Sequence, residues 1–307
     1  MSGRALLWLA CLFSCIAPVL AAQTAAPREE VLVLGRISDD PRRDYEGLKP
    51  LLDYVVARMG DVGIHEGRIL MARDTAQMAG YLRRQRVDWA TDTAATATEY
   101  QRRGVADAVL VADRGGVFGY HSVVFTWRGS GISTLADLKG RSIAFQNITS
   151  TSGFVLPAAQ MLRNGLELEV LLSPDDRPHP DNVGYVFAGK EENLAVWVQK
   201  RIVDAGAFSN LDWGRLSQLP ASFRDELQIV HESHPAPRGL ELVAHGLAPQ
   251  VRSKLVQVLL QAGEDPQARE PLQHYFGVTH FAPVDATMQR DLDRIGADVE
   301  LVRQRLE

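Results

Sequence analysis

Short apolar runs alternate with longer amphipathic stretches along the first third of the sequence. Val31–Leu34 is apolar, and the stretch from Tyr45 to Met59 carries Leu and Val residues at helical spacing. Further runs of strand length lie at 69–72, 87–90 and 109–112, with helical patterns at 75–84 and 93–103 between them. Strands and helices that alternate at this pace predict a parallel sheet with helices on both faces.

A long β-favouring run, Tyr120–Trp127, interrupts this alternation and is long enough to leave one sheet and enter another. A second α/β series follows it, with predicted strands at 142–145, 170–172, 185–187, 202–207 and 227–230. The Pro-rich stretch His234–Arg238 then leads to a strand at 240–245 and to helices at 250–263, 270–276 and 286–306.

We therefore expect an α/β protein of two lobes joined by two crossings. Residues 28–121 and 236–307 would form the first lobe, and residues 122–235 the second. A cleft between lobes joined in this way favours ligand capture by hinge closure. A single larger sheet is the alternative, because periodicity does not distinguish the two arrangements.

Composition and charge narrow the class of function. A chain of 307 residues with 46% hydrophobic content has enough apolar side chains for two compact units. Its net charge of −5 and the lack of a long basic run argue against nucleic acid as a partner. The eight histidines show no metal-ligand spacing, so we expect no metal and no cofactor. No nucleophile-elbow motif is present, and we expect no enzyme activity.

The first residues have the pattern of an export signal. Arg4 precedes the apolar stretch Ala5–Val19, and small residues follow around Ala21, which predicts a signal peptide over residues 1–22. A retained N-terminal anchor is the alternative, although the stretch is short for a membrane span. Both cysteines, Cys11 and Cys15, lie within it, so the mature chain would have no disulfide. Lipid attachment at Cys15 is the weaker possibility, because a bulky Phe13 precedes it.

The stretch Thr149–Phe154 carries the strongest candidate chemistry. It follows the apolar run 142–145 and opens a helical pattern at 155–164. Successive hydroxyls at Ser150, Thr151 and Ser152 would gather free N–H groups, O–H donors and the positive end of the helix dipole, which suits an oxyanion. An ordinary helix cap is the alternative reading. Asp92, Thr93 and residues 38–40 are further candidates, because they follow predicted strands.

These segments, read together, resemble a known family. The pattern comprises Tyr120-x-Ser122, Leu135-x-Asp137-Leu138-Lys139-Gly140, Ser150–Phe154, Gly189 and Val203–Gly206. It is similar to that of the periplasmic phosphonate/phosphite-binding proteins of ABC transporters, a branch of the type II two-lobed periplasmic binding proteins. The resemblance covers Val31 to about Phe281. It implies two Rossmann-like lobes, and it implies that Ser150, Thr151 and Ser152 hold phosphonate oxygens.

The departures from the family pattern concern the ligand. Lys190 stands where many members carry His after the turn glycine, and it is a fixed positive charge. Arg238 stands where aminophosphonate binders carry an acid, which argues against an aminoalkyl ligand; arginine also pairs with oxyanions. Asp92 stands at an aromatic position and would repel an anion unless it accepts an O–H or pairs with Lys190 or Arg238. Asp212 is a less secure match to a downstream acidic position.

We therefore predict a periplasmic solute-binding protein that captures a small oxyanion, phosphonate-like or phosphite-like, for an ABC permease. The predicted ligand contacts are Ser150, Thr151, Ser152, Lys190, Tyr120, Asp92, Thr93 and Arg238. The alternative is a periplasmic sensor that signals to a membrane histidine kinase, and an enzyme on the same fold is a further alternative. We expect a monomer. Trp89, Trp197 and Trp213 would either line the cleft or lie in the core.

Overall fold

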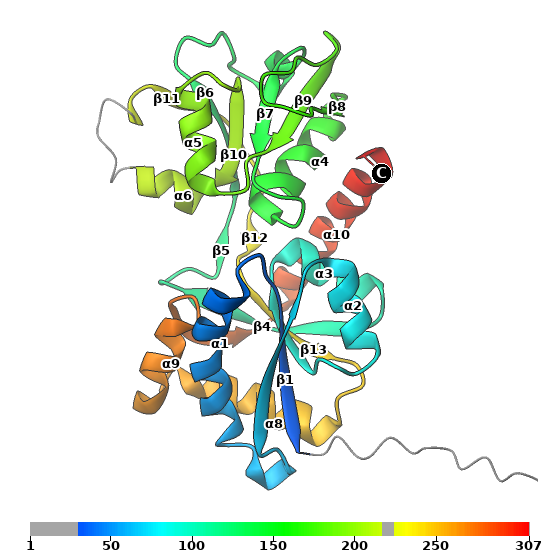
Figure 1. Cartoon of the computed structure of the whole chain (residues 1–307), viewed down its shortest axis with the longest axis vertical. Coiled ribbons are helices and arrows are strands. Elements are labelled where there is room, and N and C mark those ends of the chain that lie inside the picture. Colours follow the sequence, from blue (N-terminus) through cyan, green and yellow to red (C-terminus); the bar gives the residue numbers. More distant parts are fainter. Residues whose placement is uncertain (1–29, 217–223, 307) are drawn as a thin grey trace, which may run out of the picture.

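The computed structural model describes residues 30–216 and 224–306. Two α/β lobes, each built on a six-stranded sheet, lie one above the other and are joined by a narrow waist (Figure 1). The predicted signal peptide, with Cys11 and Cys15, lies outside the described residues. None of the helices in the described ranges is both long enough and apolar enough to cross a bilayer.

The sheet of the first lobe, called lobe 1 here, has the strand order β14-β4-β13-β3-β1-β2. Its strands are β1 (Val31–Ile37), β2 (Glu66–Ala72), β3 (Trp89–Asp92), β4 (Ala106–Arg114), β13 (Leu240–Ala244) and β14 (Val278–Pro283). β1 pairs in parallel with β2 and β3, whereas β13 runs antiparallel between β3 and β4. The expectation of a purely parallel sheet is therefore wrong, because a strand from beyond the second crossing enters the sheet in the opposite direction.

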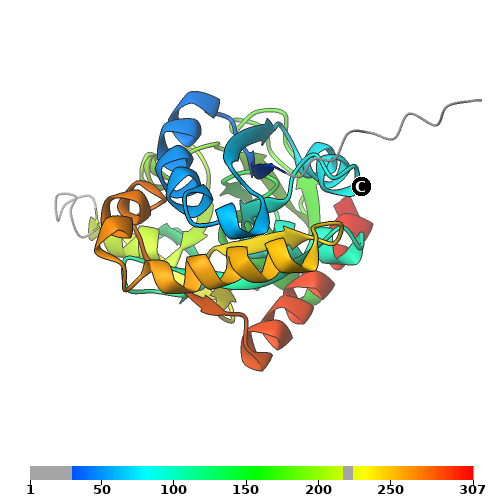
Figure 2. The ribbon, with the colours of Figure 1, turned by 90° about the horizontal axis from the view of Figure 1, so that it is seen from below.

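Helices cover both faces of this sheet. They are α1 (Pro41–Val56), α2 (Thr75–Arg83), α3 (Ala94–Arg102), α8 (Pro249–Ala262), α9 (Arg269–His274) and α10 (Ala286–Leu306), with short 3-10 turns at Gly60–Val62 and Pro266–Ala268. Asp40 caps α1 by accepting from the N–H of Arg43 at 3.2 Å, and Pro41 suits the first helical position. The leucine stripe of α1 packs into one core with α8, which crosses the base of the lobe in Figure 2.

The second lobe, lobe 2, has the strand order β11-β6-β10-β7-β9-β8. Its strands are β6 (Ser122–Trp127), β7 (Ser142–Phe145), β8 (Glu167–Val170), β9 (Asn182–Phe187), β10 (Ala205–Ser209) and β11 (Leu227–Glu232). Its helices are α4 (Leu156–Arg163), α5 (Glu191–Gln199) and α6 (Asn210–Arg215), with a 3-10 turn at Leu135–Leu138 and a π-helical turn, η3, at Thr151–Val155. The strand predicted at 170–172 is observed three residues earlier in the sequence, as β8, which ends at Val170. Leu172 lies in the loop that follows β8 and is 95% exposed.

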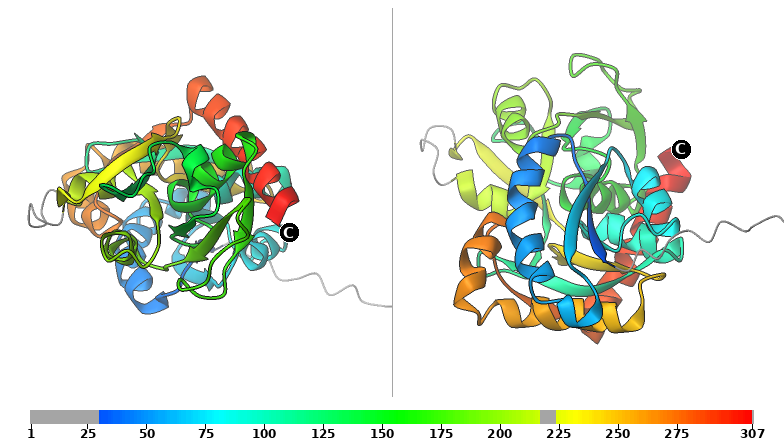
Figure 3. Two further views of the ribbon diagram at one scale, coloured as in Figure 1. Left: turned by 90° about the horizontal axis from the view of Figure 1, so that it is seen from above. Right: turned by 60° about the horizontal axis from the view of Figure 1, so that its bottom comes forward.

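Two short strands form the waist between the lobes. β5 (Gly119–Tyr120) pairs antiparallel with β12 (Ala236–Pro237), and this register places Tyr120 opposite Ala236. The C-terminal helix α10 packs against both α3 of lobe 1 and α4 of lobe 2, and it lies alongside both lobes in Figure 3. The chain therefore crosses between the lobes twice, and one helix braces them from outside.

Candidate functional site

The hydroxyl stretch, defined as residues Ser150 to Ser152, begins a helix as the sequence predicts. Ser150 is the N-cap, and its Oγ accepts from the N–H of Gly153 at 3.0 Å. The helix starts one turn before the predicted position 155, as the π-helical turn η3 that runs into α4. The backbone N–H groups of Thr151 and Ser152 have no hydrogen-bond partner among the described residues. Single π turns of this kind occur often at functional sites.

Glycine is required at position 153 by a close approach. A Cβ built there would lie 2.8 Å from Cβ of Gln146 and 2.8 Å from Oγ of Ser150. Gln146 also donates its backbone N–H to the carbonyl of Gly153 at 3.0 Å. The strand end before the stretch and the helix start are thus packed backbone to backbone, which holds the free N–H groups in place.

The hydroxyl stretch meets lobe 1 at the start of α3. Oγ1 of Thr151 accepts from the backbone N–H of Ala95 at 2.9 Å, and Oγ1 of Thr93 donates to the carbonyl of Thr149 at 3.1 Å. Both hydrogen bonds join residues of different lobes. Ser150, Thr151 and Ser152 are 8%, 0% and 6% exposed, so the stretch is buried where the lobes meet. The structure therefore brings together Thr93 and Thr151, which lie 58 positions apart in the sequence.

The first crossing supports the hydroxyl stretch from a third side. Oγ of Ser122, the first residue of β6, donates to the carbonyl of Ser152 at 2.6 Å. Burial raises the pKa of Tyr120, and hydrogen bonds with Ser152 and Thr151 partly offset that rise. The predicted candidate Tyr120 thus lies against the stretch.

Asp92 is the last residue of β3, and its side chain is buried. Its Oδ1 accepts from the N–H of Thr93 at 2.8 Å, and its Oδ2 accepts from the hydroxyl of Tyr100 at 3.1 Å. Burial raises the pKa of Asp92, and the charge of Arg36 opposes that rise. Asp92 is not ion-paired with Lys190 or Arg238 in the described structure. Its observed role is to hold the start of α3, and with it Thr93, in position.

The two predicted cations come from different parts of the fold. Lys190 is exposed at the N-terminus of α5, and its turn is joined to the stretch through Gln146, whose carbonyl accepts from the N–H of Gly189 at 2.9 Å. Arg238 follows β12, and its Nη1 donates to the carbonyl of Arg114 at 2.8 Å. Burial lowers the pKa of Arg238, and the nearby charge of Arg215 lowers it further. Lys190 therefore stands at the edge of lobe 2, and Arg238 at the waist.

Other candidates are less central. Asp40 is used as the cap of α1, and residues 38–40 make no hydrogen bond with the hydroxyl stretch in the described structure. Asp212 accepts from Ser209 at 2.5 Å and from Arg215 at 2.9 Å. Trp89 is fully buried and Trp213 packs on Phe125, which supports the core reading of these two aromatic residues.

Sequence reasoning missed two arginines. Arg36 in β1 and Arg114 at the end of β4 both lie over the ring of Phe276, with Cζ 4.8 Å and 4.5 Å from its centroid. The Nε atoms of Arg36 and Arg114 are both buried without a hydrogen-bond partner in the described structure. Burial lowers the pKa of Arg114, and the neighbouring charge of Arg36 adds to the effect. The available signal was their place at the carboxyl ends of strands.

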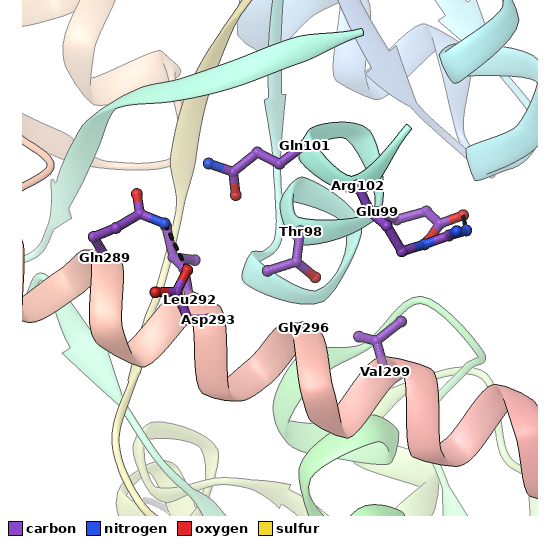
Figure 4. Close-up of a pocket in the computed structure, with 9 residues that line it drawn as sticks. All are labelled: Thr98, Glu99, Gln101, Arg102, Gln289, Leu292, Asp293, Gly296 and Val299. Carbon is purple, nitrogen blue, oxygen red and sulfur yellow. Dashed lines mark hydrogen bonds and ion pairs between the residues drawn. The ribbon is translucent and has the colours of Figure 1, made fainter. Parts of the chain in front are cut away.

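A separate surface cavity of 330 Å³ lies between α3 and α10 (Figure 4). Most of its charged and amide side chains bond to one another: Arg102 pairs with Glu99 at 2.7 Å, and Gln289 donates to Asp293 at 2.9 Å. In the described ranges, no group of three or more His, Cys, Asp or Glu side chains is arranged to hold a metal ion.

Two α/β lobes, two crossing strands and hydrogen-bond donors gathered where the lobes meet define a two-lobed binding protein of the type II periplasmic class. Residues 35–288 match the family described as ABC transporter, phosphonate, periplasmic substrate-binding protein, and the chain belongs to that family. This confirms the family and the fold that the sequence predicts. Membership implies a periplasmic location, a small solute as ligand and an inner-membrane permease as partner.

Solved structures share the fold of this chain. The chain is 47% identical to XAC2383 from Xanthomonas citri bound to chloride ion, with a TM-score of 0.86 over 90% of this chain and 99% of that one. For the same protein bound to ATP the identity is 46% and the TM-score 0.85, over 91% and 100% of the two chains. PhnD1 from Prochlorococcus marinus in complex with methylphosphonate shares the fold at 14% identity and a TM-score of 0.65, over 89% and 99%.

Proposed function

We propose that this protein captures a phosphorus oxyanion between its lobes and presents it to an ABC permease. The observation that carries the proposal is the hydroxyl stretch, a buried helix start with free N–H groups at the place where the lobes meet. Such a start supplies oriented donors and the positive end of a helix dipole, the combination that phosphate groups favour.

The donors suit a tetrahedral group with several oxygens. The N–H groups of Thr151 and Ser152 are unused, and Ser150 accepts from Gly153, which leaves its own hydroxyl hydrogen available. Hydrogen bonds from such donors to a charged oxygen are about twice as strong as those between neutral groups. Several donors bound to one anionic group would therefore fix its orientation and also stabilise its negative charge.

The relatives support the ligand class. The family description names phosphonate, and XAC2383 was solved with a chloride ion and with ATP, both of which are anions. A site built from N–H and O–H donors for anions is consistent with all three ligands, and two of the three contain phosphorus. The hydrogen bonds from Ala95 to Thr151 and from Thr93 to Thr149 would also link ligand capture to the approach of the lobes.

A thermal-shift screen tests the proposal. Inorganic phosphate, phosphite, methylphosphonate, ATP, a sulfonate, a carboxylate, a neutral sugar and a cationic amino acid are each added to the mature protein. A ligand at 100 times its Kd stabilises the folded state by about 2.7 kcal/mol, so a specific ligand gives a clear rise in Tm. We expect the rise with phosphorus oxyanions. A rise confined to neutral or cationic solutes would overturn the proposal.

The transport role is tested separately from binding. The ligand-loaded protein should stimulate ATP hydrolysis by its ABC transporter in proteoliposomes, and the ligand should be recovered chemically unchanged. Stimulation of a membrane histidine kinase instead would assign the protein to sensing. Conversion of the ligand would assign it to catalysis.

A further inference from the structure

Three arginines from separate parts of the chain gather on the lobe 1 side of the waist. We call them the arginine group: Arg36 in β1, Arg114 at the end of β4 and Arg238 just after β12. Arg36 and Arg114 share contact with the ring of Phe276, and Arg238 donates to the backbone carbonyl of Arg114 at 2.8 Å. The guanidinium groups are therefore neighbours in space.

The arginine group lacks carboxylate partners at close range. Neither Arg114 nor Arg238 forms an ion pair with any described residue, and the ion pair of Arg36 with Asp44 is long, at 3.9 Å. Nε of Arg36 and Nε of Arg114 are buried without an acceptor in the described structure. A partly buried guanidinium without a counter-charge is unfavourable, so a group of three calls for an anion that the protein itself does not supply.

Asp212, whose charge reaches Arg238, is paired with Arg215, and three other nearby acids are occupied by neutral donors. Glu241 is fully buried; it accepts from Trp89 at 2.7 Å, from Tyr275 at 2.8 Å and from Thr91 at 3.1 Å. Asp92 is taken by Thr93 and Tyr100, as described above. Oδ1 of Asp113 accepts from the N–H of Gly116 at 2.6 Å. These carboxylates moderate the local charge, but none is directed at an arginine of the group.

The backbone leaves space for the Arg114 side chain. A Cβ at Gly239 would lie 2.6 Å from Nη2 and 2.7 Å from Cζ of Arg114. Any other residue at position 239 would push the guanidinium away from its present place. The second crossing therefore supplies both a cation, Arg238, and the room for another.

The first crossing connects the arginine group with the hydroxyl stretch. The pairing of β5 with β12 sets Tyr120 opposite Ala236, two residues before Arg238. The N–H of Arg238 donates to the carbonyl of Phe118 at 2.8 Å, and Ser122, two residues after Tyr120, donates to the carbonyl of Ser152 at 2.6 Å. A ligand held at the hydroxyl stretch would extend past Tyr120 toward the arginines.

We propose that Arg36, Arg114 and Arg238 form a second anionic subsite, and that the physiological ligand carries two or more linked phosphoryl groups. This inference rests on the proposed function, because the first phosphoryl group of the ligand would bind at the hydroxyl stretch. The next phosphoryl group would bind at the arginine group. Guanidinium groups pair with phosphate oxygens in a bidentate manner. Three guanidinium groups suit the higher charge of a phosphoryl group better than the single charge of a carboxylate. A simple alkylphosphonate would leave this subsite empty.

Isothermal titration calorimetry of the mature protein tests the proposal with methylphosphonate, phosphonoacetate, pyrophosphate and ATP. We expect pyrophosphate and ATP to bind at least thirtyfold more tightly than methylphosphonate. Arg114→Gln and Arg238→Gln should each weaken pyrophosphate binding at least tenfold and change methylphosphonate binding less than threefold. Arg83→Gln is the matched control, since Arg83 is an exposed arginine of lobe 1 without an ion pair in the described structure, and it should change neither.

Two further variants separate subsite loss from misfolding. Gly239→Ala retains all three charges but displaces Arg114, and it should also weaken pyrophosphate binding while leaving methylphosphonate binding intact. Arg114→Lys retains the charge without the bidentate fork and should recover only part of the loss. The melting temperature of each unliganded variant checks its fold; if Arg114→Gln does not fold, the half-buried Arg238→Gln carries the test.

The outcomes distinguish this inference from the proposed function. If methylphosphonate binds as tightly as pyrophosphate, or if the arginine variants weaken both equally, the second subsite is wrong and the proposed function stands. If phosphonoacetate also binds at least thirtyfold more tightly than methylphosphonate, as pyrophosphate is expected to, the assignment to a phosphoryl chain is wrong. If no phosphorus oxyanion binds, the proposed function itself fails.

Discussion

The two sides of the interlobe site differ in how their polar groups are held. On lobe 2, the hydroxyl stretch is a continuous run of neutral donors, fixed by Gly153, Ser122 and the start of α3. On lobe 1, the arginine group is drawn from three separate segments, and its charges have no close partner in the described structure.

This difference assigns different tasks to the two sides. The hydroxyl stretch is set before any ligand arrives, so it can fix the orientation of an anionic group with little rearrangement. In the proposal the arginine group supplies charge, and apart from the long pair of Arg36 with Asp44 it would gain a counter-ion from the ligand. Orientation and charge neutralisation are thus separated between the lobes, and the variants below test that separation.

The largest effect is expected on the lobe 2 side. Ser150→Ala combined with Ser152→Ala removes two hydroxyl donors, and at about 1 kcal/mol per hydrogen bond the affinity should fall at least tenfold. The fall should be similar for methylphosphonate and pyrophosphate, because both would use this side. Calorimetry measures it.

The control for this variant is Ser133→Ala with Ser253→Ala, two exposed serines whose hydroxyls make no hydrogen bond within the described ranges. Loss of the Ser150 cap also lowers stability, by about 0.5–2 kcal/mol. The melting temperature of the unliganded variant therefore has to be recorded. Unchanged affinity would reduce the hydroxyl stretch to an ordinary helix cap.

A smaller effect is expected where the two sides touch. Thr151→Val keeps the shape of the side chain but removes the acceptor for the buried N–H of Ala95, which is 2.9 Å away. An unsatisfied buried donor costs about 1–3 kcal/mol, and it arises only when the lobes are together. Ligand binding should weaken about fivefold, toward the lower end of that range.

Small-angle scattering with saturating ligand should show a larger radius for Thr151→Val than for the wild type. The control Thr279→Val changes an exposed threonine of β14 and should alter neither quantity. A closed, fully active Thr151→Val protein would show that this contact between the lobes has no part in capture.

The smallest effect concerns a contact away from the ligand. Nε2 of His234 lies 3.2 Å from Oδ2 of Asp298 in α10, and Asp298 also pairs with Arg163 of lobe 2 at 2.6 Å. The hydrogen bond with Asp298 raises the pKa of His234. Its contribution to stability is therefore complete below the unfolded pKa of about 6.5 and disappears as the pH rises through the higher folded pKa.

Denaturant unfolding of His234→Gln measures this contribution. We expect the free energy of unfolding to fall by about 0.5–1 kcal/mol at pH 5.5 and to change little at pH 8.5, because the imidazole is then neutral. His65→Gln, at an exposed position, is the control. An equal loss at both pH values would point to lost packing in place of the ion pair.

The local sequence pattern was sufficient to predict most helices and strands and the lobe 2 side of the candidate site. The hydroxyl stretch could be predicted because its donors are adjacent in the sequence and a helix start has the same geometry in any protein. Tyr120 could be placed because it lies on a recognisable crossing run. The position of β13 could not, since it pairs with β3 and β4 from more than a hundred residues away.

The sequence by itself determined the alternating elements, the two crossings and the helix start at the hydroxyl stretch, because each depends on residues within one short segment. Tertiary structure alone decided the rest. It placed Arg36 and Arg114 over Phe276 and bonded Arg238 to the carbonyl of Arg114. It also directed Asp92 toward α3 and joined Thr151 to Ala95. These contacts depend on strand order and on how the lobes meet, and both result from packing between segments that are distant in the sequence.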